Sequence, residues 1–238
     1  MTHRNYKYLH YIQALFICVI LIVNLVGANK VSILNVSFPF WPYSLSWPFG
    51  TGILFFPVSY LIGDLLTEVY GYATSRMVIW TGFAVLILST LMVQFILLMP
   101  PAPDWPHQKA YEDVFSISWR IASASLIAFA SGEFVNSFVM AKMKLLTKGN
   151  QLWTRTIGST IFGEAVDTIL FYPLAFLGNA AFSPSLIGQI MLSNYLVKVC
   201  WEIIATPLTY FVINWLKKAE AEDYFDTNTN FNPFHIAD

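Results

Sequence analysis

Residues Val78–Met99 read VIWTGFAVLILSTLMVQFILLM, a run of 22 residues without a single charged side chain. At about 1.5 Å per residue, a helix of this length measures about 33 Å, close to the roughly 30 Å hydrocarbon core of a bilayer. A helix that is apolar on every side belongs in a large core or in a membrane. The stretch therefore predicts a membrane-spanning α-helix.

The composition of the whole chain agrees with this interpretation. Hydrophobic residues make up 56% of the 238 residues and charged residues only 11%, whereas a soluble domain carries about 25% charged residues. A soluble fold of this length cannot hide so much apolar surface, so the excess must face the lipid bilayer. The net charge of −1 argues against nucleic acid as a partner.

Five further apolar segments complete an all-α fold of six transmembrane helices. They are predicted at Leu9–Gly27, Gly50–Tyr72, Ser116–Met140, Thr156–Leu177 and Ile187–Leu216. The proline-rich residues Pro39–Pro48 and Pro100–Asp113 are expected to form irregular loops. We expect a transmembrane domain over residues 1–216 and a short cytoplasmic tail over residues 217–238.

The distribution of basic residues predicts the orientation. One side of a six-helix topology carries Arg4, Lys7, Arg76, Lys142, Lys144, Lys148, Arg155, Lys217 and Lys218. The opposite side has only Lys30 and Lys109, so both termini are expected in the cytoplasm. An alternative remains at the N-terminus, where the apolar run also resembles a signal peptide that would be cleaved after Ala28.

Ionisable side chains inside the apolar segments are the best candidates for a functional site. Such groups are costly in lipid, so they usually face the bundle interior and often mark a transport pathway. In the predicted topology they share one layer, and they are Asp64, Glu68, Glu133, Glu164, Asp167, Lys198 and Glu202. So many carboxylates suit a cationic ligand or proton coupling. Lys198 and Glu202 could instead simply neutralise each other across one helical turn.

The spacing of these residues places several of them on common helix faces. Residues three or four positions apart lie on one side of a helix. The sets that share a face are Tyr60 with Asp64 and Glu68, Glu133 with Asn136, and Glu164 with Asp167 and Phe171. This pattern predicts a central polar cavity.

Motifs for covalent chemistry are missing from the sequence. None of His3, His10, His107 and His235 lies within the hydrophobic part of a predicted helix, and a hydrolytic triad or a catalytic zinc site would need one there. The two cysteines indicate neither a disulfide framework nor a zinc site. No phosphate-binding glycine loop is present. We expect no catalytic residue, no metal and no cofactor, and hence no enzyme.

Several segments together resemble the queuosine precursor transporter family, which is grouped with vitamin-uptake transporters. The segments are FPVSYLIGDLLTEVYGY (Phe56–Tyr72), SGEFVNS (Ser131–Ser137), RTIGSTIFGEAVDT (Arg155–Thr168), NYLVKVCWEIIATPLTY (Asn194–Tyr210) and DYFDTNTNFNPF (Asp223–Phe234). The resemblance implies import of 7-cyano-7-deazaguanine, its 7-aminomethyl derivative, or both, for queuosine synthesis in transfer RNA. It also implies a fold similar to the substrate-binding subunits of energy-coupling-factor transporters, and a location in a bacterial inner membrane.

One feature of the first helix departs from those subunits. An A-x-x-x-A motif for docking a shared ATPase is expected there, but this sequence has Ala14 followed by Cys18. A stand-alone carrier is therefore favoured over one that depends on an ATPase module. A homo-oligomer remains an open alternative.

The resemblance suggests roles for the candidate residues. The base edge of a deazaguanine would pair with Glu133 or Asp167, because one carboxylate can accept a ring N–H and an amine together. Tyr60, Tyr70 or Phe171 would stack on the ring. The remaining assignments place Asn136 or Lys198 at the ring carbonyl, and Asp64 and Glu68 near the 7-substituent or a proton. Glu164 is a further candidate for the binding site. The alternatives are a proton-coupled carrier of another organic cation and a non-transporting scaffold.

Overall fold

The computed structural model describes residues 6–27, 30–37, 44–116, 118–178 and 183–235, and most of these are helical. The helices are α1 (Leu9–Leu25), α2 (Phe56–Tyr70), α3 (Tyr72–Leu98), α4 (Gln108–Phe115), α5 (Trp119–Leu146), α6 (Leu152–Phe176) and α7 (Pro184–Glu220), and a 3-10 turn covers Thr51–Leu54. Strands β1 (Val31–Ser37) and β2 (Ser44–Gly50) form an antiparallel hairpin. Apart from this hairpin, the described residues confirm a helical fold.

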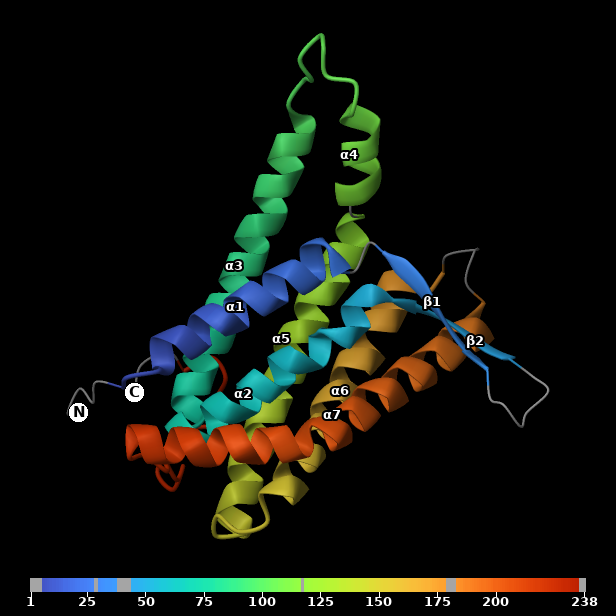
Figure 1. Ribbon diagram of the computed structural model, residues 1–238. Helices are drawn as coiled ribbons and strands as arrows, with labels where there is room; N and C mark the ends of the chain where they lie inside the picture. Colours follow the sequence, from blue (N-terminus) through green and yellow to red (C-terminus); the bar gives the residue numbers. More distant parts are fainter. Residues whose placement is uncertain (1–5, 28–29, 38–43, 117, 179–182, 236–238) are drawn as a thin grey trace.

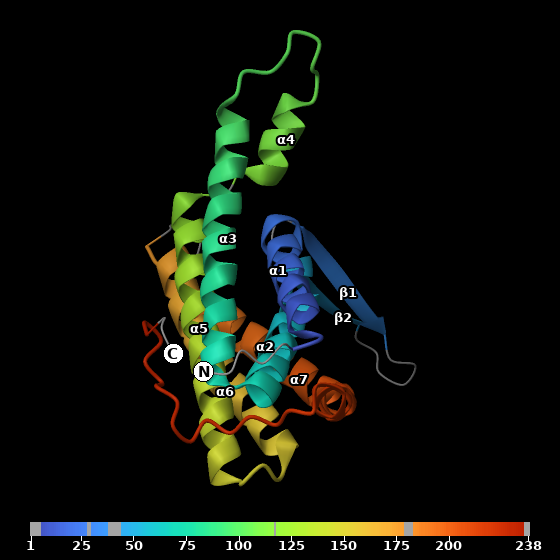
Figure 2. The same ribbon diagram turned by 90° about the vertical axis from the view of Figure 1, so that its left-hand side faces the viewer.

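The long helices form two groups. Helices α3, α5 and α6 stand side by side, whereas α1, α2 and α7 cross the bundle at an angle to them (Figures 1 and 2). Helix α2 contacts α1, α3, α5 and α7 and so joins the two groups. The turn after α3 and helix α4 project beyond the other helices at one end (Figure 2).

The helix lengths and surfaces agree with a membrane protein. In the described part of the chain, four helical stretches are long and apolar enough to cross a bilayer, namely Thr51–Tyr70, Tyr72–Leu98, Gln108–Leu146 and Pro184–Glu220. Large apolar side chains stay exposed on the outside, such as Phe95 at 61% and Ile204 at 79%. Apolar surface of this extent requires lipid or another apolar partner. The count of six crossings stays a prediction, because α1 has only 17 residues and α6 carries several charges.

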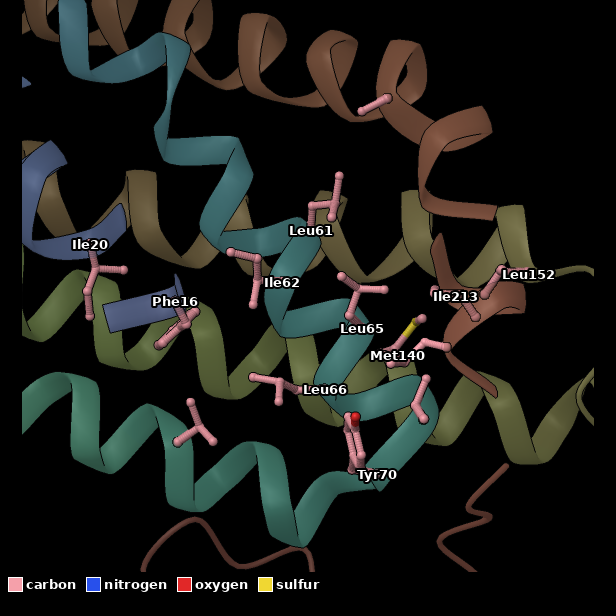
Figure 3. Close-up of a cluster of buried hydrophobic side chains, with 14 of the residues drawn as sticks. Phe16, Ile20, Leu61, Ile62, Leu65, Leu66, Tyr70, Met140, Leu152 and Ile213 are labelled. Carbon is pink, nitrogen blue, oxygen red and sulfur yellow. The ribbon is translucent and has the colours of Figure 1, made fainter. Parts of the chain in front are cut away.

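Helix α2 lies in the middle of the hydrophobic core. All of its residues except Phe56 and Val58 are buried. Its Leu61, Ile62, Leu65 and Leu66 pack among side chains of α1, α5, α6 and α7 (Figure 3). Neighbouring helices therefore cover this segment on nearly every side.

Expectations about three connections are wrong. Of Pro39–Pro48, expected to be an irregular loop, residues 44–48 belong to strand β2 because they pair with β1, and residues 39–43 lie outside the described part of the chain. The stretch between α2 and α3 is not a loop, because Gly71 alone separates the two helices and Arg76 lies within α3. Gly71 has a φ of 86°, which favours glycine, and the ring of Tyr224 occupies the place where a Cβ would be. The proline-rich segment after α3 contains the helix α4, which starts only after its last proline, Pro106.

The C-terminal segment packs against the bundle. Helix α7 continues to Glu220, past the predicted boundary of the tail. Beyond it, the Asp226 carboxylate accepts the Tyr72 backbone N–H at 3.0 Å and thereby caps the start of α3. The Trp80 indole donates to the carbonyl of Pro233 at 2.7 Å. These contacts hold the segment against α3.

A test of the close packing between α5 and α6 uses Gly132→Ala. A Cβ at this position would lie 2.6 Å from the Tyr60 hydroxyl and 3.1 Å from the carbonyl oxygen of Gly163. We expect a loss of about 1–3 kcal/mol in stability, because the added methyl group would overpack this contact and force the side chain or the backbone to shift. Thermal unfolding in detergent measures the loss. Gly188→Ala is the matched control, since a Cβ there meets nothing within 4 Å; equal melting temperatures for the two variants would contradict the packing.

Candidate functional site

The polar side chains inside the bundle form three clusters, the upper one on α6 and α7, the middle one on α2, α5 and α7, and the lower one on all four of these helices and the segment after α7. The upper cluster comprises Glu164, Asp167 and Lys198. The middle cluster comprises Tyr60, Asp64, Glu133, Asn136 and Glu202. The lower cluster comprises Glu68, Lys144, Arg155, Lys217 and Asp223.

The upper cluster is centred on one lysine. The Lys198 ammonium of α7 donates to Glu164 at 2.6 Å and to Asp167 at 2.9 Å, both on α6. It also lies 4.3 Å from the ring centroid of Phe56 on α2, close enough for a cation–π interaction. The cluster therefore carries two acids and one base, and it leaves Asp167 and Lys198 on the wall of a cavity.

The cavity lies above this cluster and has a volume of about 560 Å³. Small-molecule sites usually measure about 300–1,000 Å³. Its wall includes aromatic side chains, namely Phe56, Phe171, Tyr172 and Phe176. Polar groups are supplied by Asn24, Ser125 and Asn194. Rings for stacking and a few polar groups above a charged floor suit a flat, polar organic molecule.

Hydrogen bonds orient the polar groups of the cavity wall. The Asn24 amide donates to the Ile20 carbonyl at 2.8 Å, and its oxygen accepts from the Ser125 hydroxyl at 3.1 Å. The Asn194 amide donates to the Tyr172 hydroxyl. These contacts join α1 to α5 and α6 to α7, so the wall is braced across both pairs of helices.

The middle cluster is fully buried. Asp64, Glu133, Asn136 and Glu202 each have 0% exposure. The Asn136 amide donates to Asp64 Oδ1 at 2.8 Å. The other oxygen of Asp64 and both oxygens of Glu133 and of Glu202 have no hydrogen-bond partner among the described residues.

The lower cluster is a network of ion pairs. Arg155 of α6 holds the two carboxylate oxygens of Glu68 through its Nε at 2.7 Å and an Nη at 2.8 Å. Lys217 of α7 reaches the same carboxylate at 2.5 Å. Lys144 of α5 donates to the Glu68 carbonyl at 2.6 Å and to Asp223 at 2.5 Å. The network thus joins four helices and the C-terminal segment at one end of the bundle.

Asp223 closes this network from outside the helices. Partial burial alone would raise the pKa of Asp223, but its hydrogen bonds and charge interactions with Lys144 and Lys217 hold the pKa below its usual value. The carboxylate is therefore ionised at neutral pH. The three cations face two carboxylates, which leaves one positive charge at this end of the bundle.

The predicted site residues divide among the three clusters. Asp167, Lys198 and Phe171 line the cavity, and Glu164 contacts Lys198. Tyr60, Asp64, Glu133 and Asn136 lie directly below in the middle cluster. Glu68 belongs to the lower cluster, and Tyr70 donates to Glu220 at 2.8 Å. Neither Glu68 nor Tyr70 lines the cavity, so their role in binding stays a prediction without geometric support.

The pairing of charges differs from one alternative considered for the sequence. Lys198 pairs with the two acids of α6 and makes no ion pair with Glu202 among the described residues. Arg155 is only 1% exposed, so it is an interior ion-pair partner and more than an interfacial anchor.

Sequence reasoning missed two sets of residues. One is the cavity wall from Asn24, Ser125, Tyr172 and Asn194. The polar side chains of Asn24, Ser125 and Asn194 in apolar runs were a usable signal. The other is the share of Lys144, Lys217 and Asp223 in the lower cluster. Nothing in the linear spacing relates these three residues, because the chain folds back after α7 to bring them together.

Comparison with known proteins identifies the family. Residues 50–212 match the family described as "Putative vitamin uptake transporter". The chain belongs to this family. The match includes all of the upper and middle clusters, so the buried acids lie in the part of the chain that is shared with the vitamin uptake transporters. The resemblance read from the sequence segments is thereby confirmed.

The names of individual relatives are more specific than the description of the family. A "Probable queuosine precursor transporter" of Bacillus subtilis (strain 168) is 33% identical over 148 residues, which are 62% of this chain and 64% of the relative. The "Queuosine precursor transporter" of Escherichia coli (strain K12) is 27% identical over 221 residues, 92% of both chains. A third, from Haemophilus influenzae, is 27% identical over 164 residues, 68% of this chain and 67% of the relative. No solved structure matches this vitamin uptake transporter sequence significantly.

Proposed function

We propose that the protein imports 7-deazaguanine precursors of queuosine across the bacterial inner membrane, as a carrier that works without an ATPase module. The observation that carries this proposal is the floor of the cavity, where Asp167 and Lys198 present an acceptor and a donor below aromatic walls. The names of the relatives supply the substrate class.

The chemistry of the floor suits a deazaguanine. Its ring N–H and exocyclic amine lie side by side, and the free oxygen of one carboxylate, such as Asp167, can accept from them. Lys198 is within reach of the ring carbonyl, because it already bonds the same carboxylate at 2.9 Å. Phe171 and Tyr172 offer faces for stacking on the ring. A 7-cyano or 7-aminomethyl group would point into the remaining volume.

The topology that we propose has six crossings with both termini in the cytoplasm. The Lys7 backbone, Arg76, Lys144 and Lys217 all contact residues 220–232, so the segments that carry most of the basic residues meet at one end of the bundle. The cavity is lined from the opposite end, by the last residues of α1 and α6 and the first residues of α5 and α7. A basic end in the cytoplasm supports an orientation in which the cavity faces the outside. The lower cluster then closes the inner end.

Uptake measurements test the proposal. Cells that cannot make 7-cyano- or 7-aminomethyl-7-deazaguanine are expected to accumulate at least one of the labelled compounds only when they express this protein. Cells with an empty vector are the control. Unrelated organic cations should not compete; uptake of such a cation, with no uptake of either precursor, would replace the proposal by a carrier of another cation.

A further inference from the structure

The middle cluster contains buried acids that form no ion pair with any cation of the described residues. Lys198 is held by Glu164 and Asp167 above, while Arg155 and Lys217 are held by Glu68 below. Asp64 of α2 and Glu202 of α7 have 0% exposure and no ion pair in the described part of the chain. An ionised carboxylate without a partner is very unfavourable in such a place, so at least part of this cluster must hold protons.

The described cavity does not reach Asp64 or Glu202. It touches Asp167 and Lys198 of the upper cluster instead. No group of three or more His, Cys, Asp or Glu side chains among the described residues has the arrangement for a metal ion. The Glu133 carboxylate also packs closely against α2, because one of its oxygens would lie 2.9 Å from a Cβ added at Gly63. A proton is the one cation that needs no room.

Other buried donors and acceptors of the bundle lack partners as well. Among the described residues, the hydroxyls of Tyr60 and Thr160 and the carbonyl oxygen of Asn136 have no hydrogen-bond partner. A hydroxyl in this position can donate to a carboxylate after its proton has left, and an amide oxygen can accept from a protonated acid. The cluster therefore has groups suited to both the protonated and the ionised form.

We propose that Asp64 and Glu202 form a proton-binding pair that couples substrate import to the proton gradient. Helices α2 and α7, which carry the two acids, pack against each other, and one oxygen of Asp64 and both oxygens of Glu202 lack a hydrogen-bond partner among the described residues. The other titratable groups that face the pair are Tyr60 from α2, Glu133 from α5 and Glu164 from α6. This inference rests on the proposed transport function.

Glu164 connects the substrate floor with the proton pair. A substrate carbonyl that attracts Lys198 would leave the charge of Glu164 less compensated, and this would favour a proton on the neighbouring Glu202. By linkage, a proton on the pair would in turn favour bound substrate. The proton comes from external water, forms an O–H bond with a carboxylate of the pair, and returns to water on the cytoplasmic side after the lower cluster opens. Substrate and proton would thus cross together.

Proton uptake by the purified wild-type protein is the direct test. In weakly buffered detergent solution with a pH indicator, binding of the uncharged 7-cyano-7-deazaguanine should remove about one proton from solution per bound molecule. This measurement needs no variant, so it remains decisive even if substitutions in the core prevent folding. Binding without proton uptake would overturn the proton pair and leave the transport proposal intact.

Proteoliposomes give the second test. With an acidic exterior, the wild-type protein should accumulate substrate, whereas Asp64→Asn and Glu202→Gln should lose accumulation but still exchange external for internal substrate. Glu112→Gln, on the exposed surface of α4, is the matched control and should accumulate like wild type. If the two variants still accumulated substrate when the exterior is acidic, the proton pair would be disproved. A wild-type protein that neither binds nor exchanges a precursor would instead disprove the transport function.

Discussion

Glu68→Ala is expected to lower the stability of the protein by about 3–5 kcal/mol, the usual effect of removing one partner of a buried ion pair. Glu68 is 0% exposed, and its carboxylate is the common acceptor for Arg155 and Lys217. Without it, these cations and Lys144 would converge with only Asp223 to neutralise them. Thermal unfolding in detergent and the yield of folded protein measure the effect.

Two further variants sharpen this prediction. Arg155→Lys keeps the positive charge but loses the two-point contact with Glu68, so an intermediate loss of stability is expected. Glu112→Ala makes the same type of change on the exposed face of α4 and should leave the melting temperature unchanged. If Glu68→Ala unfolded at the temperature of the control, the lower cluster would not hold the helices together.

Asp167→Asn is expected to reduce precursor uptake by about 30- to 1,000-fold, because truncating or neutralising one member of a desolvated charge pair removes about 2–4 kcal/mol of binding. Asp167 is the one acid of the upper cluster on the cavity wall. Folding should be preserved, since Glu164 still holds Lys198 at 2.6 Å and the amide has the shape of the acid. Initial rates of labelled uptake, corrected for the amount of protein in the membrane, measure the loss.

The matched control for this variant is Asp113→Asn, the same change on the exposed α4. It should transport at the wild-type rate. Wild-type uptake by Asp167→Asn would show that the base edge is bound elsewhere, and Glu133 in the middle cluster would then be the next candidate. Loss of the folded protein would instead assign Asp167 a structural role.

The local pattern of the chain was sufficient for most helices. Long apolar runs predicted α1, α3, α5, α6 and α7 with small errors at the ends, because the apolar character needed in lipid is visible in a single stretch of sequence. The predictions failed where a contact between distant segments decides the structure. The hairpin of β1 and β2 and the continuous passage through Gly71 are such places.

For the candidate site too, the sequence predicted some features, and contacts between helices decided the others. The presence of buried acids on α2, α5, α6 and α7 could be predicted, since a charge in an apolar helix must face the interior. Their pairing could not: Asp64 and Glu68 are one helical turn apart, yet one lies in the middle cluster without a cation and the other binds Arg155 and Lys217. Lys198 likewise pairs across helices with Glu164.

The sequence by itself determined that this protein is a helical membrane protein of the vitamin uptake transporter family with acids in its interior, because hydrophobicity and family motifs are properties of contiguous residues. Only the tertiary structure decided which acids have a cation, which line the cavity, and that the segment after α7 returns to close one end. The physical reason is that charge pairing acts over a few ångströms in space. Lys198 and Asp167 lie 31 positions apart in the chain, and Lys217 and Glu68 lie 149 positions apart.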